Sequence, residues 1–314
     1  MQSVPAADCW FLTGPTASGK SAVSLALAQR LNAEIVSMDS MALYRGMDIG
    51  TAKPGQRERG VIPHHLVDIL SPHEEFSLAT YVAEAERISA EIQTRGRQVL
   101  FVGGTPLYLK ALLRGIFIGP PADWELRRTL TALAEQGEAG ELHARLAQVD
   151  PTTARRLHAG DTRRIIRALE VFEKTGRPIS ELQRQFDRAR PASQARVFVL
   201  CWPRALLNQR IDRRVDQMFT IGLVDEVRAL LDRGTPLGRT ASQAVGYREV
   251  IQHLRGERPL DETVELVKLR TRQFAKRQMT WFRSLSECRM IELVRAPDVE
   301  DLANQIVAQG SNLG

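Results

Sequence analysis

The stretch Gly14-Pro15-Thr16-Ala17-Ser18-Gly19-Lys20-Ser21 organises the rest of the chain. It fits the phosphate-loop pattern, in which glycines allow a tight turn that points amides at an anion. Lys20 adds positive charge, and the Ser21 hydroxyl can bind magnesium. The apolar run at 9–12 indicates a buried strand before the loop, and the pattern from Ser21 to Leu31 indicates a helix after it. We therefore predict a diphosphate site, with a chance glycine-rich turn as the alternative.

The size and composition of the chain limit its class. With 314 residues it can bury a large core, as one domain or as a domain with an insertion. No stretch approaches the roughly 18 to 20 apolar residues of a membrane span, and the N-terminus lacks a basic leader. The three cysteines are widely spaced, which predicts reduced thiols. We expect a cytoplasmic protein with no membrane association.

Charge is distributed unevenly along the chain. Residues 1–150 hold 14 Lys and Arg against 17 Asp and Glu, for a net charge of −3, and residues 151–314 carry +9. A basic second half beside a phosphate loop suggests two anionic substrates, one small and one a polyanion such as nucleic acid. An ordinary basic surface would give the same charge.

A second predicted strand, at 34–38, ends at Asp39-Ser40. In a doubly wound sheet this position adjoins the ligand site, so we expect Asp39 to lie near the phosphate loop. Its carboxylate could hold magnesium through water, accept a proton or cap the next turn. His64, His65 and His73 follow in a spacing that matches no standard zinc site, and a packing or solvated role is favoured.

A third predicted strand, at 98–102, follows a helix at about 77–95 and runs into Gly103-Gly104-Thr105. A nucleotide hydrolase usually places a magnesium-binding Asp at the end of such a strand. Glycines here would instead let another molecule approach the backbone, and Thr105 could donate a hydrogen bond to it. A plain turn is the alternative.

The composition changes at Pro120-Pro121, and no strand-like run recurs before 197–201. We therefore predict an α/β fold, with a doubly wound, mostly parallel sheet and an all-helical insertion. The predicted bounds are 1–119 and 196–314 for the catalytic core and 120–195 for the insertion. Arginines in the insertion fit a phosphate backbone or simply face water: Arg155, Arg156, Arg163, Arg164 and Arg167.

The second part of the core contains further basic helices. Arg210 and Arg214, one turn apart, could clamp a departing diphosphate or pair with Asp212 and Asp216 at the surface. Between 265 and 283 the helical period groups basic residues on one side and apolar ones opposite. The basic set is Arg272, Lys276 and Arg283, and the apolar set is Val267, Phe274 and Trp281. A strand at 290–294 and a helix near 299–309 are expected to complete the sheet layer.

Several further motifs resemble the bacterial-type tRNA dimethylallyltransferases, which prenylate an adenosine adjoining the anticodon. Besides the phosphate loop, the matching stretches are 37–40, Tyr44-Arg45-Gly46-Met47-Asp48-Ile49-Gly50-Thr51-Ala52-Lys53-Pro54, 103–105 with Leu107-Tyr108, 167–171, Val245-Gly246-Tyr247-Arg248 and Ala275-Lys276-Arg277-Gln278. They span nearly the whole chain, and their combination is far more specific than a phosphate loop alone.

The resemblance implies a phosphate-loop kinase-like fold and roles for individual residues. Dimethylallyl diphosphate would bind at Gly14, Thr16, Ala17, Ser18, Gly19, Lys20 and Ser21, with Mg²⁺ at Ser21. The catalytic set would be Asp39 as the base, Arg214 at the diphosphate and Thr105. The tRNA anticodon stem-loop would contact Asp39, Ser40, Met41, Ala42, Thr105, Arg127, Arg163, Arg164, Arg167, Gly246, Tyr247, Arg248, Lys276, Arg277 and Trp281. We expect the protein to act as a monomer.

The residues and the resemblance lead to one predicted reaction. The exocyclic amine of adenine attacks the allylic carbon of the donor, Asp39 takes the amine proton, and the leaving diphosphate is neutralised by the loop, Lys20, magnesium and Arg214. No phosphoryl group moves, so no strand-end Asp is needed. Two alternatives are a prenyltransferase of free adenine nucleotides and a small-molecule kinase.

Overall fold

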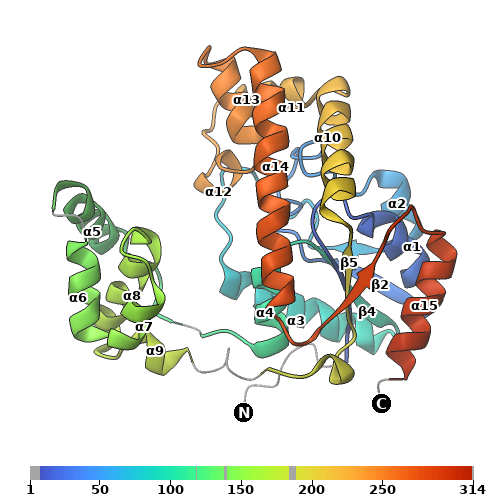
Figure 1. Ribbon diagram of the computed structural model, residues 1–314, viewed down its shortest axis with the longest axis horizontal. Helices are drawn as coiled ribbons and strands as arrows, with labels where there is room; N and C mark the ends of the chain where they lie inside the picture. Colours follow the sequence, from blue (N-terminus) through green and yellow to red (C-terminus); the bar gives the residue numbers. More distant parts are fainter. Residues whose placement is uncertain (1–7, 118, 138–139, 184–188, 313–314) are drawn as a thin grey trace. The chain divides into compact units, whose positions relative to one another are not determined.

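The computed structural model describes residues 8–117, 119–137, 140–183 and 189–312 (Figure 1). The chain forms two compact units, the larger from residues 1–113 with 189–314 and the smaller from 114–188. The described strands of the larger unit make one six-stranded sheet in the order β3-β2-β4-β1-β5-β6, with every pairing parallel. They are β1 (Trp10–Thr13), β2 (Ala33–Ser37), β3 (His64–His65), β4 (Gln98–Gly103), β5 (Val197–Cys201) and β6 (Cys288–Glu292). The predicted doubly wound α/β fold is confirmed.

Strand β1 lies at the centre of the sheet, and all four of its side chains are buried. Three of them are apolar, and the fourth, Thr13, is hydrogen-bonded. The strand pairs with β4 on one side, where Thr13 is opposite Gly103, and with β5 on the other, where Phe11 is opposite Val197. Strand β6 begins two residues before the predicted strand at 290–294. Strand β3 was not predicted, since two residues carry no detectable alternation.

Helices cover both faces of the sheet. The right-handed crossovers of a doubly wound order put α1 and α3 on opposite faces, and α15 packs beside α1. Leu27 of α1 and Ile306 of α15 share a core cluster with Trp10. The helices of this unit are α1 (Lys20–Leu31), α2 (Gln56–Val61), α3 (Leu78–Thr94), α4 (Pro106–Arg114), α10 (Arg204–Thr220), α11 (Leu223–Leu231), α12 (Arg239–Ser242), α13 (Tyr247–Leu254), α14 (Leu260–Arg283), α15 (Val299–Ser311) and the short 3-10 turn η2 (Ala192–Gln194).

Among its described residues, the smaller unit contains helices joined by loops and no strand. It contains α5 (Trp124–Gln136), α6 (Glu141–Val149), α7 (Pro151–Arg156), α8 (Thr162–Thr175) and α9 (Ile179–Leu182). Leu146, Ile165 and Leu169 are buried in its own hydrophobic core, so this unit packs around its own residues. Among the described helices of either unit, none is long and apolar enough to cross a membrane.

Candidate active site

The phosphate loop joins the end of β1 to the start of α1, as the sequence predicted. Gly14 has φ +146°, and a Cβ there would lie 2.5 Å from the carbonyl oxygen of Leu200. Gly19, with φ +97°, begins α1 as its N-cap. Ser18 donates its amide to Pro15 O at 3.3 Å, which closes the turn. The loop therefore presents the N-terminus of α1 to one pocket, where an anion is favoured.

Two side chains hold the loop from outside. Ala17 has φ +62°, a left-handed conformation that is unfavourable for a residue with a Cβ. Arg210 donates from Nε to Ala17 O at 2.8 Å, and Trp202 donates from Nε1 to Ser18 O at 3.0 Å. The Arg210 guanidinium also lies over the Trp202 ring, 4.4 Å from its centroid. Arg210 therefore binds a backbone carbonyl of the phosphate loop.

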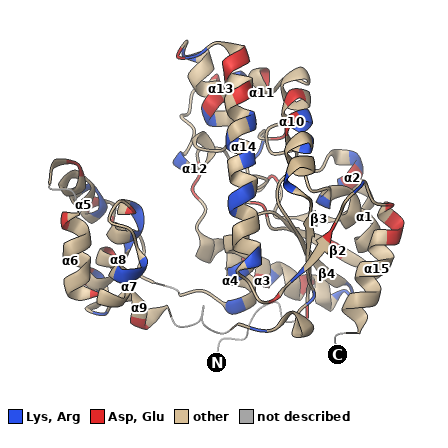
Figure 2. Cartoon of the chain, in the orientation of Figure 1, with Lys and Arg blue, Asp and Glu red and all other residues tan. Residues whose placement is uncertain are grey.

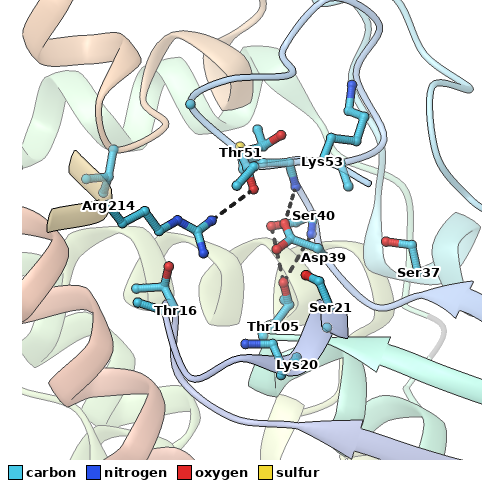
Figure 3. A pocket seen from close by; sticks show the side chains of 18 of the residues that line it. Thr16, Lys20, Ser21, Ser37, Asp39, Ser40, Thr51, Lys53, Thr105 and Arg214 are labelled. Atoms are coloured by element: carbon cyan, nitrogen blue, oxygen red, sulfur yellow. Dashed lines mark hydrogen bonds between the residues drawn. The ribbon is translucent and has the colours of Figure 1, made fainter. Parts of the chain in front are cut away.

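Lys20 and Arg214 bring two cations to the same pocket (Figure 3). Lys20 Nζ donates to Gly14 O at 2.9 Å and to Pro15 O at 2.8 Å. The pKa of Lys20 is lowered to about 7, first by burial and next by the nearby charge of Arg214, while the charge of Asp39 opposes both. Arg214 donates to Thr51 O at 3.4 Å, whereas its buried Nε has no hydrogen-bond partner among the described residues. Both cations are thus suited to an anion in this pocket.

Arg214 does not pair with the acidic residues of its own helix. Asp212 instead binds Arg272 at 2.6 Å, and Asp216 binds Lys268 at 2.7 Å, both on α14. These ion pairs fasten α10 to α14 and leave Arg214 directed at the pocket. The surface pairing considered from the sequence is therefore not found.

Asp39 lies in the pocket beyond the end of β2, near the phosphate loop. Its Oδ1 accepts the amide of Met41 at 2.9 Å, which is a capping contact for the following turn. Ser40 donates its amide to Thr105 Oγ1 at 3.1 Å and so joins the ends of β2 and β4. No hydrogen bond to the second Asp39 carboxylate oxygen is found among the described residues, so this oxygen is left for a ligand. Figure 3 shows the side chain among Thr105, Lys20 and Ser21.

The two glycines at the end of β4, Gly103 and Gly104, are required by contacts within the chain. A Cβ on Gly103 would overlap the carbonyl group of Met38, and one on Gly104 would lie 2.7 Å from the Gln278 side chain. The close approach at these glycines is therefore made by other parts of this chain. Thr13 also donates its hydroxyl to Gly103 O at 2.7 Å, which fixes this strand end.

The pocket has a volume of about 550 Å³ and lies at the carboxyl ends of the strands. Ser21 and Asp39 both line it, and no group of three or more His, Cys, Asp or Glu side chains suited to a metal occurs among the described residues. Magnesium bound with a phosphorylated substrate takes only one or two protein ligands, the remainder being phosphate oxygens and water. A hydroxyl and a carboxylate at one pocket therefore fit Mg²⁺ that arrives with a diphosphate.

The loop at 44–54 covers one side of the pocket and is held by charged side chains that the sequence reading missed. Lys53 is only 1% exposed and donates to Tyr44 O at 2.7 Å, Asp48 at 2.6 Å and Asp68 at 2.5 Å. A buried lysine can be suspected from a sequence only when its acidic partners are known, and Asp68 comes 15 residues later.

Glu226 of α11 holds the same loop from the other side. Its carboxylate accepts three successive amides, those of Asp48 at 2.9 Å, Ile49 at 2.7 Å and Gly50 at 3.3 Å. It also accepts the Tyr247 hydroxyl at 2.6 Å. Burial, and next the charge of Glu226, raise the pKa of Tyr247 far above its usual range, so this phenol stays protonated and donates. No local pattern at 226 signals this role.

Comparison with known proteins agrees with this geometry. A family model described as IPP transferase matches residues 42–285, and one described as isopentenyl transferase matches residues 7–64. The chain belongs to the IPP transferase family. It is 50% identical to a tRNA dimethylallyltransferase of Geobacter metallireducens over 89% of this chain and 90% of that protein. For a tRNA dimethylallyltransferase of Rhodopirellula baltica, identity is 45% over 96% and 93%.

Solved structures give the same result for this IPP transferase family member. The full-length tRNA isopentenylpyrophosphate transferase of Bacillus halodurans matches with a TM-score of 0.69 and 37% identity, over 97% of both chains. A eukaryotic dimethylallyltransferase acting on tRNA matches with a TM-score of 0.72 and 28% identity, over 96% of this chain and 77% of that one. The family resemblance seen in the motifs is confirmed.

The residues that the family resemblance assigned to RNA differ in their exposure. On α13 and α14, Arg248, Lys276 and Arg277 are exposed, and Figure 2 shows basic residues along α14. Ala42, Gly246 and Tyr247 are buried, and the Tyr247 hydroxyl is bound to Glu226. Met41, Ser40 and Trp281 are partly exposed. Any contact of RNA with the stretch at 246–248 would therefore rely on Arg248 and the backbone.

The apolar side of α14 also differs from the helical-period prediction. Val267 is buried as expected, but Phe274 is 37% exposed and lines the pocket. On the basic side, Arg272 is held by Asp212, whereas Lys276 is exposed and forms no ion pair with the described residues. The helical period of the sequence predicts the side of α14 that packs against the protein. Contacts with other elements decide which residues of the apolar and basic sets are buried.

In the helical unit of this family member, two of the assigned arginines bind an internal acid. Arg127 donates from Nε and Nη2 to the two oxygens of Glu170 at 2.8 Å each, and Arg167 donates to Glu170 as well. The Glu170 side chain is fully buried. Arg163 and Arg164 are exposed, and Arg164 lies 3.2 Å from Asp161. Of the four arginines assigned to RNA in this unit, two bind the buried Glu170 and two are exposed at the surface.

Proposed function

We propose that this protein transfers a dimethylallyl group from dimethylallyl diphosphate to the exocyclic amine of the adenosine adjoining the anticodon in tRNA, releasing diphosphate. The observation that carries the proposal is the meeting of a carboxylate, Asp39, and two cations, Lys20 and Arg214, at one phosphate-loop pocket. The names of the close relatives support the same substrates.

The pocket residues divide the chemistry between them. The loop amides, Lys20 and Arg214 bind the diphosphate and stabilise the negative charge that grows on it as the allylic carbon–oxygen bond breaks. Ser21, together with Asp39 through water, would hold Mg²⁺, which supplies further neutralisation of the leaving group. Asp39 orients the adenine amine and takes its proton as the new carbon–nitrogen bond forms.

The RNA must deliver an unstacked base to this pocket. Adenine in a stacked anticodon loop cannot reach a carboxylate at a strand end, so the nucleotide is drawn out of the stack. We propose that Arg248, Lys276 and Arg277, which are exposed, hold the adjoining phosphates. We propose that the surface cations Arg163 and Arg164 of the helical unit bind the stem.

One assay tests the proposal against its alternatives. The protein is incubated with labelled dimethylallyl diphosphate and Mg²⁺ in the presence of either tRNA or AMP, and with ATP as a control donor. Label in tRNA alone supports the proposal. Label in AMP would identify a prenyltransferase of free nucleotides, and phosphate transfer from ATP would identify a kinase. Loss of labelling when the target adenosine is replaced by guanosine would locate the site.

A further inference from the structure

Gln278 lies in the C-terminal third of the basic helix α14, yet its side chain points inward and is only 4% exposed. Its neighbours Lys276 and Arg277 are exposed. The Gln278 Oε1 accepts the amide of Thr16 at 3.0 Å, and its Nε2 donates to Gly104 O at 2.6 Å. One side chain therefore connects the basic helix α14 to the phosphate loop and to the end of β4.

These two contacts reach both halves of the active site. Thr16 belongs to the loop that we assign to the diphosphate, whereas Gly104 precedes Thr105, whose hydroxyl binds the amide of Ser40 next to Asp39. The space at Gly104 is already filled by the Gln278 amide, because a Cβ there would lie 2.7 Å from Nε2. The position of Gln278 thus affects both the loop and the strand end that carries Thr105.

The contact requires a side chain that both accepts and donates. A carboxamide supplies an acceptor oxygen for Thr16 N–H and a donor nitrogen for Gly104 O, whereas an ionised carboxylate of the same shape can only accept. A lost partner would leave Gly104 O or Thr16 N–H unpaired in a buried setting, which is costly. Gln278 is therefore fitted to this bridge by its chemistry as well as by its shape.

We propose that Gln278 is a positioning residue that couples diphosphate binding to RNA binding. This inference rests on the proposed function. RNA phosphates held by Lys276 and Arg277 restrain α14, and Gln278 transmits that restraint to the loop amides before the donor arrives. Preorganisation of a site lowers the cost of filling it. Each ligand then tightens the other by the same factor, since coupling between two sites is reciprocal.

The test measures binding of inorganic diphosphate with Mg²⁺ to the full chain, with and without a tRNA anticodon stem-loop. In the unmodified protein we expect the RNA to tighten diphosphate binding, within the range of roughly 5-fold to 150-fold common for coupled sites. Gln278→Glu should weaken diphosphate binding and abolish most of this factor, while RNA affinity without diphosphate is retained. Gln278→Met removes both hydrogen bonds without adding charge. It should also weaken diphosphate binding and lose the coupling, and it replaces Gln278→Glu in the test if that variant unfolds.

The matched control is Gln273→Glu on the same helix, where the Gln273 side chain accepts a hydrogen bond from the surface residue Arg270. It adds the same charge and should keep the coupling. A full coupling factor in both folded Gln278 variants, or its equal loss in the Gln273 variant, would overturn the proposal. If the unmodified protein binds both ligands independently, the coupling fails but the proposed function stands. If it binds neither, the proposed function fails as well.

Discussion

At the level of single residues, Asp39 bears the chemistry of the proposed reaction. An adenine amine is a weak nucleophile because its lone pair is delocalised, and attack makes the nitrogen acidic. Asp39→Asn keeps the shape and the acceptor for Met41 N–H but removes the base. We expect the single-turnover rate of transfer to fall by about 10²-fold to 10⁴-fold, with both substrates still bound.

Rates measured with both substrates saturating separate the possible roles of Asp39. A near-normal rate in Asp39→Asn would reduce Asp39 to a cap of the following turn. Normal chemistry with weakened RNA binding would make it a specificity residue instead. The binding of inorganic diphosphate to the variant provides the control for an intact phosphate loop.

At the level of elements, the contact between α11 and the loop at 44–54 depends on one carboxylate. Glu226→Gln leaves only one acceptor oxygen for the amides of 48–50 and the Tyr247 hydroxyl. Hydrogen bonds to a charged group contribute about 1.5–3 kcal/mol, so we expect the free energy of unfolding to fall by about that amount. Hydrogen exchange at amides 48–50 should also become faster.

The control for this prediction is on the same helix. The Asp225 side chain is 79% exposed and pairs with the exposed Arg228, so Asp225→Asn should change the free energy of unfolding by less than about 0.5 kcal/mol. Equal effects of the two substitutions would mean that the loop is held mainly by Lys53 and its aspartates.

The helices of the smaller unit are joined by a buried charge cluster that should make its stability depend on pH. Burial alone would raise the pKa of Glu170, but hydrogen bonds from Arg127 and Arg167 outweigh it and hold the pKa below its usual value of 4.5. A carboxyl whose pKa is lower in the folded state stabilises fully above its unfolded pKa. We therefore expect constant stability above about pH 5, and a loss as the pH falls through the folded pKa of Glu170.

Hydrogen exchange across residues 140–183, followed between pH 7 and pH 3, measures this effect. Glu170→Gln should destabilise the unit at pH 7, and its difference from the unmodified protein should shrink toward pH 3. Glu173→Gln, on the same helix but with a half-exposed side chain paired to Arg145, is the control and should shift little. A pH-independent difference for Glu170→Gln would exclude ionisation as its cause.

For the whole molecule, RNA binding should reveal which basic residues are available. Lys276 is exposed, whereas Arg272 is already bound to Asp212. A lysine that binds an RNA phosphate releases counterions, and this release makes the affinity depend on salt. Lys276→Ala should therefore reduce the slope of log affinity against log salt by about 0.7–0.9. Arg272→Ala should leave that slope nearly unchanged, although it breaks a link between α10 and α14.

The comparison is made with the tRNA anticodon stem-loop at several salt concentrations. The two variants remove the same charge from one helix, so a difference between them cannot come from net charge. An unchanged slope in Lys276→Ala would mean that this side of α14 faces only solvent, and the RNA surface would have to be sought elsewhere.

Local patterns were sufficient for much of this fold. The apolar runs at 9–12, 34–38, 98–102 and 197–201 predicted β1, β2, β4 and β5, and glycine spacing located the phosphate loop. The two-residue strand β3 escaped because it is too short for any period. Strand β6 begins two residues early because its side chains are only partly buried and give a weak signal.

Side-chain partnerships were beyond the sequence. Gln278 meets Thr16 across 262 residues, and Glu226 meets Ile49 across 177. Each involves a polar residue whose role is set by what the fold brings beside it, so no spacing rule identifies it. The same holds for Arg127 and Arg167, whose guanidinium groups were assigned to RNA by resemblance and are bound to the buried Glu170.

The bridge through Gln278 also bears on how the protein is synthesised. The phosphate loop and both strands that flank β1 have been made once residue 201 is added, but Gln278 is added later. At a translation rate of ~5–20 residues per second, roughly 4 to 15 s pass between the synthesis of residue 201 and that of Gln278, which then contacts the loop at Thr16. During that interval the nascent chain carries a phosphate loop with no contact to α14. A diphosphate encountered by the ribosome-bound chain would therefore meet an incompletely restrained site.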